Sequence, residues 1–164
     1  MNRDDLVRDT YAHFGLAVYK AQVLESGIVN AMVIARMPDR ARITRADIDS
    51  FMDRQFKNTL GQLLRTLKKH VVVPDSVAGL LDQALSTRNW LAHDYFRERA
   101  TEFVTEAGCH QMISELQGAQ QLFSSADDQL GTVVRPIRER FGMTDEAIAS
   151  EVQATMAGLG ELDG

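Results

Sequence analysis

Apolar residues recur every three or four positions along most of the chain, which is the spacing of one buried face on an α-helix. In the first segment this face consists of Phe14, Ala17, Val18, Ala21, Leu24, Ile28 and Met32. The pattern predicts a helix that begins near Asp4 or Asp5, where acidic residues suit the helix dipole. It ends at about Met37, because the residue before Pro38 is biased away from helical angles.

The same spacing predicts a second, a third and a fourth helix, which end near residues 70, 99 and 141, and a short final helix capped by Thr144. We expect Thr44 or Asp47 to cap the second helix, and Asp75 or Ser76 to cap the third, because short polar side chains bond free backbone N–H groups. The fourth helix starts at about residue 109, after a glycine interrupts the pattern at 108, and it bends near residue 131 or 136.

These elements predict an all-α fold, namely an up-and-down bundle of four to five helices. The single β-branched run, at 71–73, is too short and isolated to suggest a sheet. The chain of 164 residues has the usual length of one domain, with neither an internal repeat nor a linker. We therefore expect one helical domain over residues 1–157 and a flexible C-terminal tail over residues 158–164.

Composition and cysteine content indicate the class of protein and its cellular location. Hydrophobic residues make up 45% and charged residues 25% of the chain, as in globular proteins, and the single cysteine excludes an internal disulfide. The sequence lacks the apolar core of a signal peptide and any apolar run of the roughly 18–20 residues that span a membrane, so we expect a cytoplasmic protein with no membrane contact.

The net charge of −5 argues against general nucleic-acid binding. Residues 36–70, however, contain nine lysines and arginines against four aspartates. This basic segment is either a solvated helix face or a guide for a phosphate backbone.

One arginine lies where an apolar residue is expected. At about 100° per residue, Arg88 is at the centre of the apolar stripe of the third helix, while Asn89 and His93 follow one border of it. The first helix also has a charge, Glu25, inside its apolar arc. Because a buried guanidinium is costly unless it is paired, we predict that Glu25 and Arg88 approach closely. A purely scaffolding ion pair is the alternative.

Arg88 and His93 together indicate phosphate chemistry. An arginine stabilises a developing phosphorane or binds an anion, and a histidine exchanges protons near neutral pH. Asn89, one turn before His93, is placed to orient the imidazole or to contact a sugar or phosphate. The alternative for His93 is a partly buried ring that is hydrogen-bonded within the bundle.

This segment resembles the signature of the HEPN superfamily, named for a domain of higher eukaryotes and prokaryotes. That signature is an arginine, four to six residues of which the first is polar, and a histidine, which here are Arg88, Asn89 and His93. A subset from toxin–antitoxin systems adds a tyrosine two positions after the histidine, where this chain has Tyr95. The position late in the third helix of a small helical chain also agrees.

The resemblance implies a metal-independent endoribonuclease that works as a homodimer on RNA and needs no organic cofactor. Arg88 and His93 would be catalytic, with Asn89 positioning the phosphate and with Glu25 and Tyr95 in support. The matching tyrosine is a target for adenylylation by a partner nucleotidyltransferase antitoxin. The role would be that of a toxin or of a phage-defence or stress protein restrained by such a partner.

Two other interpretations stay open at this point. One is a catalytically inactive HEPN-like module that binds a nucleotide, an RNA or a protein in the same groove. The other is a helical-bundle adaptor unrelated to the family.

Overall fold

The computed structural model describes residues 3–35, 50, 54 and 58–160 of the chain. Within these residues it contains six α-helices, one short 3-10 helix and no β-strand, which confirms the predicted all-α class for this part of the chain. None of the helices in the same residues combines the length and apolar composition that crossing a membrane requires. The expected caps Thr44 and Asp47, and most of the basic segment before residue 58, lie outside the described residues.

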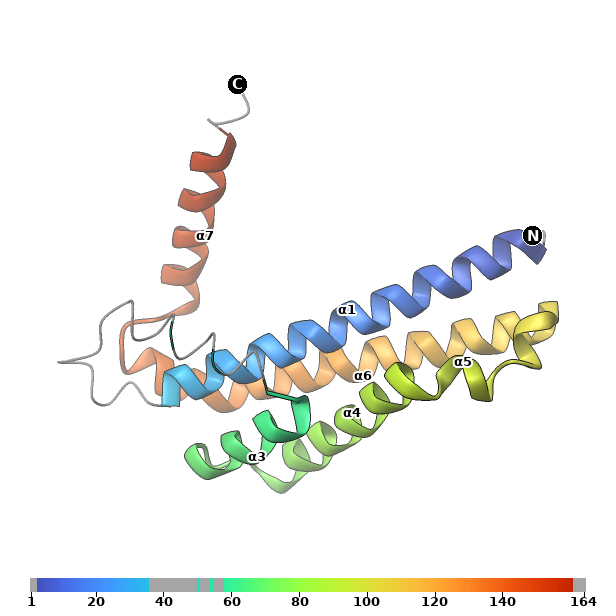
Figure 1. Ribbon diagram of the computed structural model, residues 1–164. Coiled ribbons are helices and arrows are strands. Elements are labelled where there is room, and N and C mark those ends of the chain that lie inside the picture. Colours follow the sequence, from blue (N-terminus) through green and yellow to red (C-terminus); the bar gives the residue numbers. More distant parts are fainter. Residues whose placement is uncertain (1–2, 36–49, 51–53, 55–57, 161–164) are drawn as a thin grey trace.

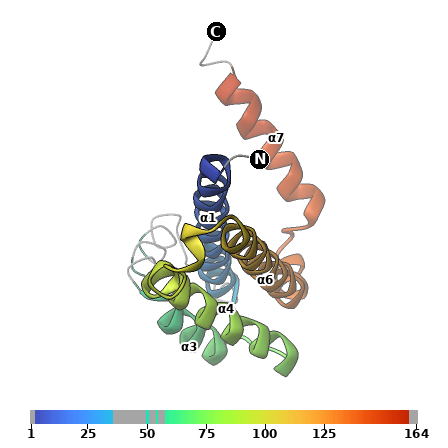
Figure 2. The ribbon, with the colours of Figure 1, turned by 90° about the vertical axis from the view of Figure 1, so that its right-hand side faces the viewer.

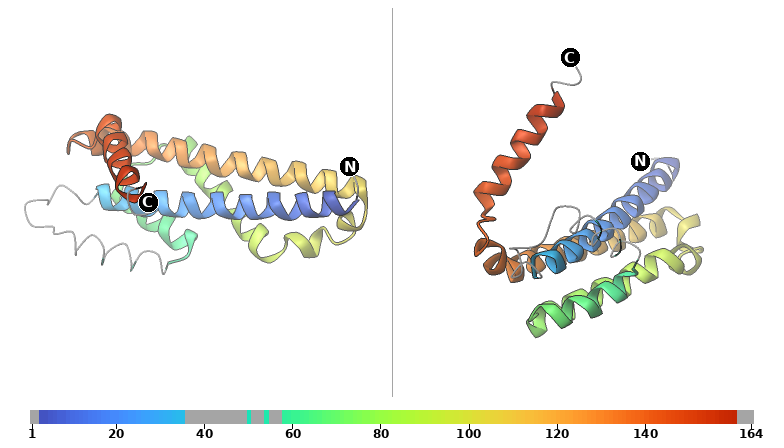
Figure 3. Two further views of the ribbon diagram at one scale, coloured as in Figure 1. Left: turned by 90° about the horizontal axis from the view of Figure 1, so that it is seen from above. Right: turned by 60° about the vertical axis from the view of Figure 1, so that its left-hand side comes forward.

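Two long helices form the main axis of the fold. α1 (Arg3–Ala35) and α6 (Glu106–Glu139) run side by side in the same direction (Figures 1 and 3). Apolar burial holds them together, and a hydrogen bond from Lys20 Nζ to Ser124 Oγ at 2.6 Å joins their flanks. The predicted first helix is thus confirmed over the residues that the structure describes.

The two shorter helices α3 (Leu60–His70) and α4 (Asp75–His93) form a layer against this pair (Figure 2). The direction of the chain reverses between α3 and α4, and again between α4 and α6 (Figure 1). A single apolar core joins the layers, and its buried members include Leu24, Ile28, Leu63, Leu67, Leu81, Met112, Leu116 and Phe123.

The second predicted helix is interrupted before its last eleven residues. Thr59 has extended backbone angles (φ −71°, ψ 157°) and is the N-cap of α3. Its N–H donates to the Gln62 side chain at 2.8 Å, while the Gln62 N–H donates to the Thr59 hydroxyl at 3.4 Å. This is a capping box, in which two side chains satisfy each other's free backbone N–H groups. The Thr-x-x-Gln spacing is a recognisable sequence signal for such a helix start.

The third predicted helix also differs at its start. α4 begins directly after Pro74, which is its N-cap and makes no side-chain hydrogen bond. The prediction that Asp75 or Ser76 caps this helix is therefore wrong. Both residues lie inside the first turn, where the carboxylate of Asp75 still suits the helix dipole.

The third predicted helix ends early as well, at His93. Asp94 leaves helical geometry (φ −126°, ψ −24°), and the four-residue helix α5 (Tyr95–Glu98) follows it. The expected single helix to residue 99 is therefore two helices. No glycine or proline marks this break, so the sequence pattern alone did not indicate it.

Gly108 lies inside α6 rather than before it, which corrects the predicted start of the fourth helix. Thr105 is the N-cap, and its hydroxyl accepts a hydrogen bond from the Gly108 N–H at 3.0 Å. A Cβ at position 108 would lie 2.0 Å from the Glu102 carbonyl oxygen in the 3-10 helix η2 (Glu102–Val104). The glycine therefore permits close packing of two elements, and α6 continues as one helix through Pro136.

The last helix, α7 (Asp145–Gly160), projects away from the bundle (Figures 1 and 2). Thr144 caps it as predicted, because its hydroxyl accepts a hydrogen bond from the Ala147 N–H at 3.2 Å. The helix is longer than expected and includes residues 158–160 of the predicted tail, whereas residues 161–164 lie outside the described residues.

Candidate functional site

Arg88 on α4 and Glu25 on α1 form an ion pair. Arg88 Nε lies 3.2 Å from Glu25 Oε1, so the approach predicted from the two helical patterns is confirmed. The side chains are 31% and 24% exposed, respectively. Arg88 is therefore half-buried beside water and is not enclosed in the core, and the attraction between the two charges is partly screened.

The pair lies in a groove of about 280 Å³ between α1 and α4, which we call the α1–α4 groove. Its lining residues are Phe14, Val18, Ala21, Gln22, Glu25, Arg88, Leu91 and Ala92. The walls are mostly apolar, and Arg88 supplies the one cation among these eight residues. A phosphate or carboxylate that enters the groove would meet a guanidinium in surroundings of lowered dielectric, where electrostatic attraction is stronger than in bulk water.

Asn89 contacts the same guanidinium from the exposed side. Its Oδ1 accepts a long hydrogen bond of 3.4 Å from Arg88 Nη1. Glu25 thus holds the Nε edge and Asn89 holds Nη1, while Nη2 makes no hydrogen bond to any residue that the structure describes. Two neighbours orient the arginine, and the two N–H donors of Nη2 are left for a ligand.

His93 is the last residue of α4, and its side chain is exposed. It does not line the α1–α4 groove and makes no hydrogen bond or ion pair with the described residues. Ala92 faces the groove, and the next residue on a helix points about 100° away from it. Within one chain, therefore, the structure brings Glu25, Arg88 and Asn89 together but does not bring His93 to them.

Tyr95 lies beneath the groove and is buried. Its hydroxyl donates to the Met112 carbonyl of α6 at 3.1 Å, and its ring stacks on Phe14, a lining residue, at 5.9 Å between centroids. Burial, and secondly the Glu115 carboxylate, raise the pKa of the Tyr95 hydroxyl above its ordinary value of 10.0. Tyr95 supports the groove wall through Phe14, and in this conformation its hydroxyl is covered, so an adenylylating enzyme would have to act on an opened form.

An uncovered apolar surface lies on α1. Leu16, Tyr19 and Val23 share one face of the helix and are 42%, 61% and 38% exposed, respectively. Large apolar side chains that gather on one exposed face often mark a surface for another protein. The sequence analysis assigned only the opposite, core-facing side of this helix.

The sequence analysis did not identify two charged residues on the core-facing side of α6. Asp127 follows the buried Phe123 by four positions, and Arg138 follows the buried Val134 by four. Positions four apart share a helix face, so this spacing is a signal of the same kind as that of Arg88. Both residues line a second cavity, which is described below.

The chain was compared with protein-family models, with curated proteins and with solved structures, and none of them matches it. The resemblance to HEPN proteins therefore depends on the residues between Arg88 and Tyr95 and on the helical character of the chain.

Proposed function

We propose that this chain is a metal-independent endoribonuclease of the HEPN type that acts as a homodimer. The observation that carries the proposal is the half-buried Arg88 in the α1–α4 groove, oriented by Glu25 and Asn89 and with donors left over. A phosphate stabilised by a pre-oriented guanidinium is a common arrangement for phosphodiester cleavage.

In the proposed reaction Arg88 stabilises the negative charge that develops on the phosphorus oxygens, and Asn89 positions the phosphate. His93 takes the proton from the attacking 2′-hydroxyl or gives one to the leaving 5′-oxygen. The bond from the 2′-oxygen to phosphorus forms as the bond to the 5′-oxygen breaks. The product strand therefore ends in a 2′,3′-cyclic phosphate.

A second copy of the chain is part of the proposal, because one chain does not present both groups to one phosphate. Arg88 and His93 are about 140° apart around α4, since each residue turns the helix by about 100°. A two-fold axis beside α4 would bring the arginine of one copy near the histidine of the other.

The direct test is RNA cleavage in the presence of EDTA. Arg88→Ala and His93→Ala should each lower the rate by about a hundredfold or more. Arg97→Ala and His110→Ala are matched controls, because both side chains are exposed and neither lines the groove. Unchanged thermal unfolding would show that the inactive variants are folded. Cleavage that needs a divalent cation, or that survives both substitutions, would refute the proposal.

A complementation experiment tests the dimer. Two inactive variants, Arg88→Ala and His93→Ala, are coexpressed with different tags, and the mixed dimers are isolated. If arginine and histidine come from different copies, one of the two symmetric sites in each mixed dimer is complete, and activity returns to about half of the wild-type value. If both groups act from one copy, mixed dimers stay inactive.

We propose the role of a toxin or of a phage-defence or stress protein, restrained by an antitoxin-like partner. The second candidate is a catalytically inactive HEPN-like module that binds a nucleotide, an RNA or a protein in the groove. It is favoured by the exposed His93, whose ring no described residue orients. Fluorescence anisotropy with a labelled RNA separates the two, because a binding module retains affinity while the RNA stays intact.

A further inference from the structure

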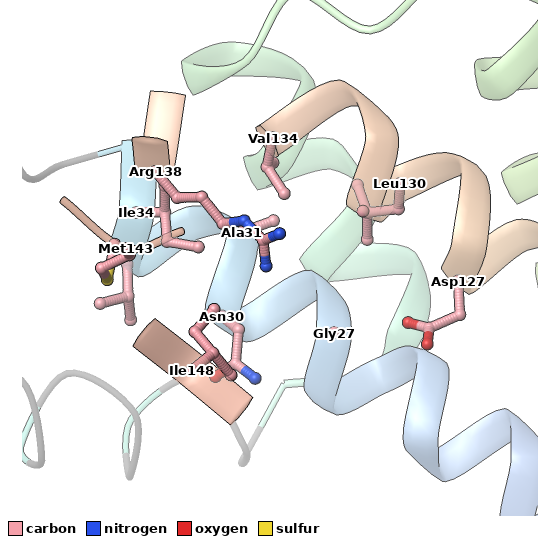
Figure 4. A pocket seen from close by; sticks show the side chains of 12 residues that line it. Gly27, Asn30, Ala31, Ile34, Asp127, Leu130, Val134, Arg138, Met143 and Ile148 are labelled. Atoms are coloured by element: carbon pink, nitrogen blue, oxygen red, sulfur yellow. The ribbon is translucent and has the colours of Figure 1, made fainter. Parts of the chain in front are cut away.

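A second cavity, of about 440 Å³, lies between α1, the C-terminal half of α6 and the beginning of α7 (Figure 4). Its walls are mostly apolar and include Ala31, Val33, Ile34, Leu130, Val134, Met143 and Ile148. Pockets of roughly 300–1,000 Å³ with apolar walls and a few polar groups are typical of small-molecule sites. This cavity shares no lining residue with the α1–α4 groove, so it is a separate site.

Arg138 supplies a hydrogen-bond donor without an acceptor at one end of the cavity. Its Nε is buried and has no hydrogen-bond partner among the described residues, although one of its terminal nitrogens pairs with Asp145. The Arg138 side chain is only 19% exposed, whereas that of Asp145 is 62% exposed. The guanidinium extends into the cavity toward Ala31 (Figure 4), and its other terminal nitrogen, which makes no hydrogen bond to a described residue, can donate to a ligand there.

Asp127 supplies an acceptor without a donor at the other end. Its carboxylate is half-buried and makes no hydrogen bond to a described residue. Loss of water on burial, and secondly the neighbouring Asp128, raise the pKa of this carboxyl above its ordinary value. A Cβ at position 27 would lie 2.3 Å from Asp127 Oδ1, so Gly27 leaves the space in which the carboxylate lies.

The two groups are on one helix, eleven residues apart, which corresponds to roughly 16 Å along its axis. Arg138 extends back over part of this distance, and the wall between the two ends is mostly apolar, with Asn30 as a polar member (Figure 4). We infer that the cavity binds an elongated zwitterion that places a carboxylate at Arg138, an ammonium group at Asp127 and an apolar chain between them. This inference is independent of the proposed nuclease function.

Titration of the full chain with 8-aminooctanoate tests the inference, with octanoate and octylamine as analogues that carry one charge each. The methyl signals of Val134, Met143 and Ile148 in NMR spectra report binding in the cavity. The zwitterion should bind about tenfold more tightly than either analogue, because it alone satisfies both ends. Equal affinities for the three compounds, or no methyl shift at millimolar concentrations, would overturn the inference.

Variants locate the two ends. Asp127→Asn should remove the preference for 8-aminooctanoate over octanoate. Glu106→Gln is the matched control, because its side chain is exposed on the same helix and does not line the cavity. Arg138→Gln should remove the preference for 8-aminooctanoate over octylamine. Arg135→Gln is its control, because the Arg135 side chain is exposed. Thermal unfolding shows that each variant is folded. If a control variant loses the preference as fully as its partner does, the charged ends do not bind the ligand and the inference is wrong.

Discussion

The substitution Glu25→Gln isolates the electrostatic part of the pair that orients Arg88. Glutamine keeps the shape of the side chain and an oxygen that accepts from Arg88 Nε, but it removes the negative charge 3.2 Å away. Arg88 then keeps its position in an apolar groove without a counter-charge. We therefore expect a lower free energy of unfolding with little change in the fold.

The magnitude follows from the exposure of the two side chains. Exposed ion pairs contribute about 0.2–1 kcal/mol, and breaking a fully buried pair costs about 3–5 kcal/mol. Since the partners are 31% and 24% exposed, they lie between these limits. We expect a loss of about 1–2 kcal/mol. In a domain of this size each kcal/mol lowers the melting temperature by about 2–4 °C.

Urea unfolding at low and high salt measures this loss, and the slope with urea concentration should stay the same. Asp82→Asn is the matched control, because it breaks the ion pair with Lys68, whose partners are 37% and 58% exposed, and it should cost less than about 0.5 kcal/mol. The double variant of Glu25→Gln with Arg88→Gln should be more stable than the sum of the single losses implies. If Glu25→Gln costs no more than the control, Arg88 does not depend on Glu25, and the reasoning is refuted.

Two further substitutions test the surroundings of the site. Tyr95→Phe should cost about 1 kcal/mol near pH 8, because the Met112 carbonyl loses its donor. Because folding raises the pKa of Tyr95, its hydroxyl contributes fully to the free energy of unfolding below pH 10.0, the pKa in the unfolded chain, and this contribution is lost at higher pH. Urea unfolding at pH 8 and at pH 10.5 should therefore show a smaller difference in stability between wild type and variant at the higher pH. Gly108→Ala should lower the melting temperature by several degrees, because the added Cβ would lie 2.0 Å from the Glu102 carbonyl oxygen. Gly118→Ala is the control: the space around Gly118 is open, so alanine should raise the melting temperature slightly. Equal effects at the two glycines would contradict the packing argument.

Helical periodicity predicted the ion pair because both partners lie on long, regular helices. Over such a helix each residue turns by a constant angle, so a charge in the middle of an apolar stripe can be recognised from the order of the residues alone. Glu25 and Arg88 were recognised in this way. Asp127 obeys the same rule on α6 and was equally predictable.

Periodicity did not predict the places where a helix stops without glycine or proline. The break at Asp94 places Tyr95 on a new helix, and the Tyr95 hydroxyl then reaches α6. Such breaks depend on tertiary packing, here an aromatic cluster in which the rings of Trp90 and Tyr95 lie 4.7 Å apart. The groove is a product of two helices and their crossing, and no pattern within one helix contains that information.

The relation between Arg88 and His93 explains why one chain holds only half of the proposed chemistry. Five residues along a helix separate two side chains by about 7.5 Å along the axis and by about 140° around it. Arg88 accordingly points into the α1–α4 groove, while His93 is exposed at the end of α4. The proposed nuclease therefore takes its histidine from a second copy of the chain, and a two-fold axis near α4 is the simplest operation that supplies it.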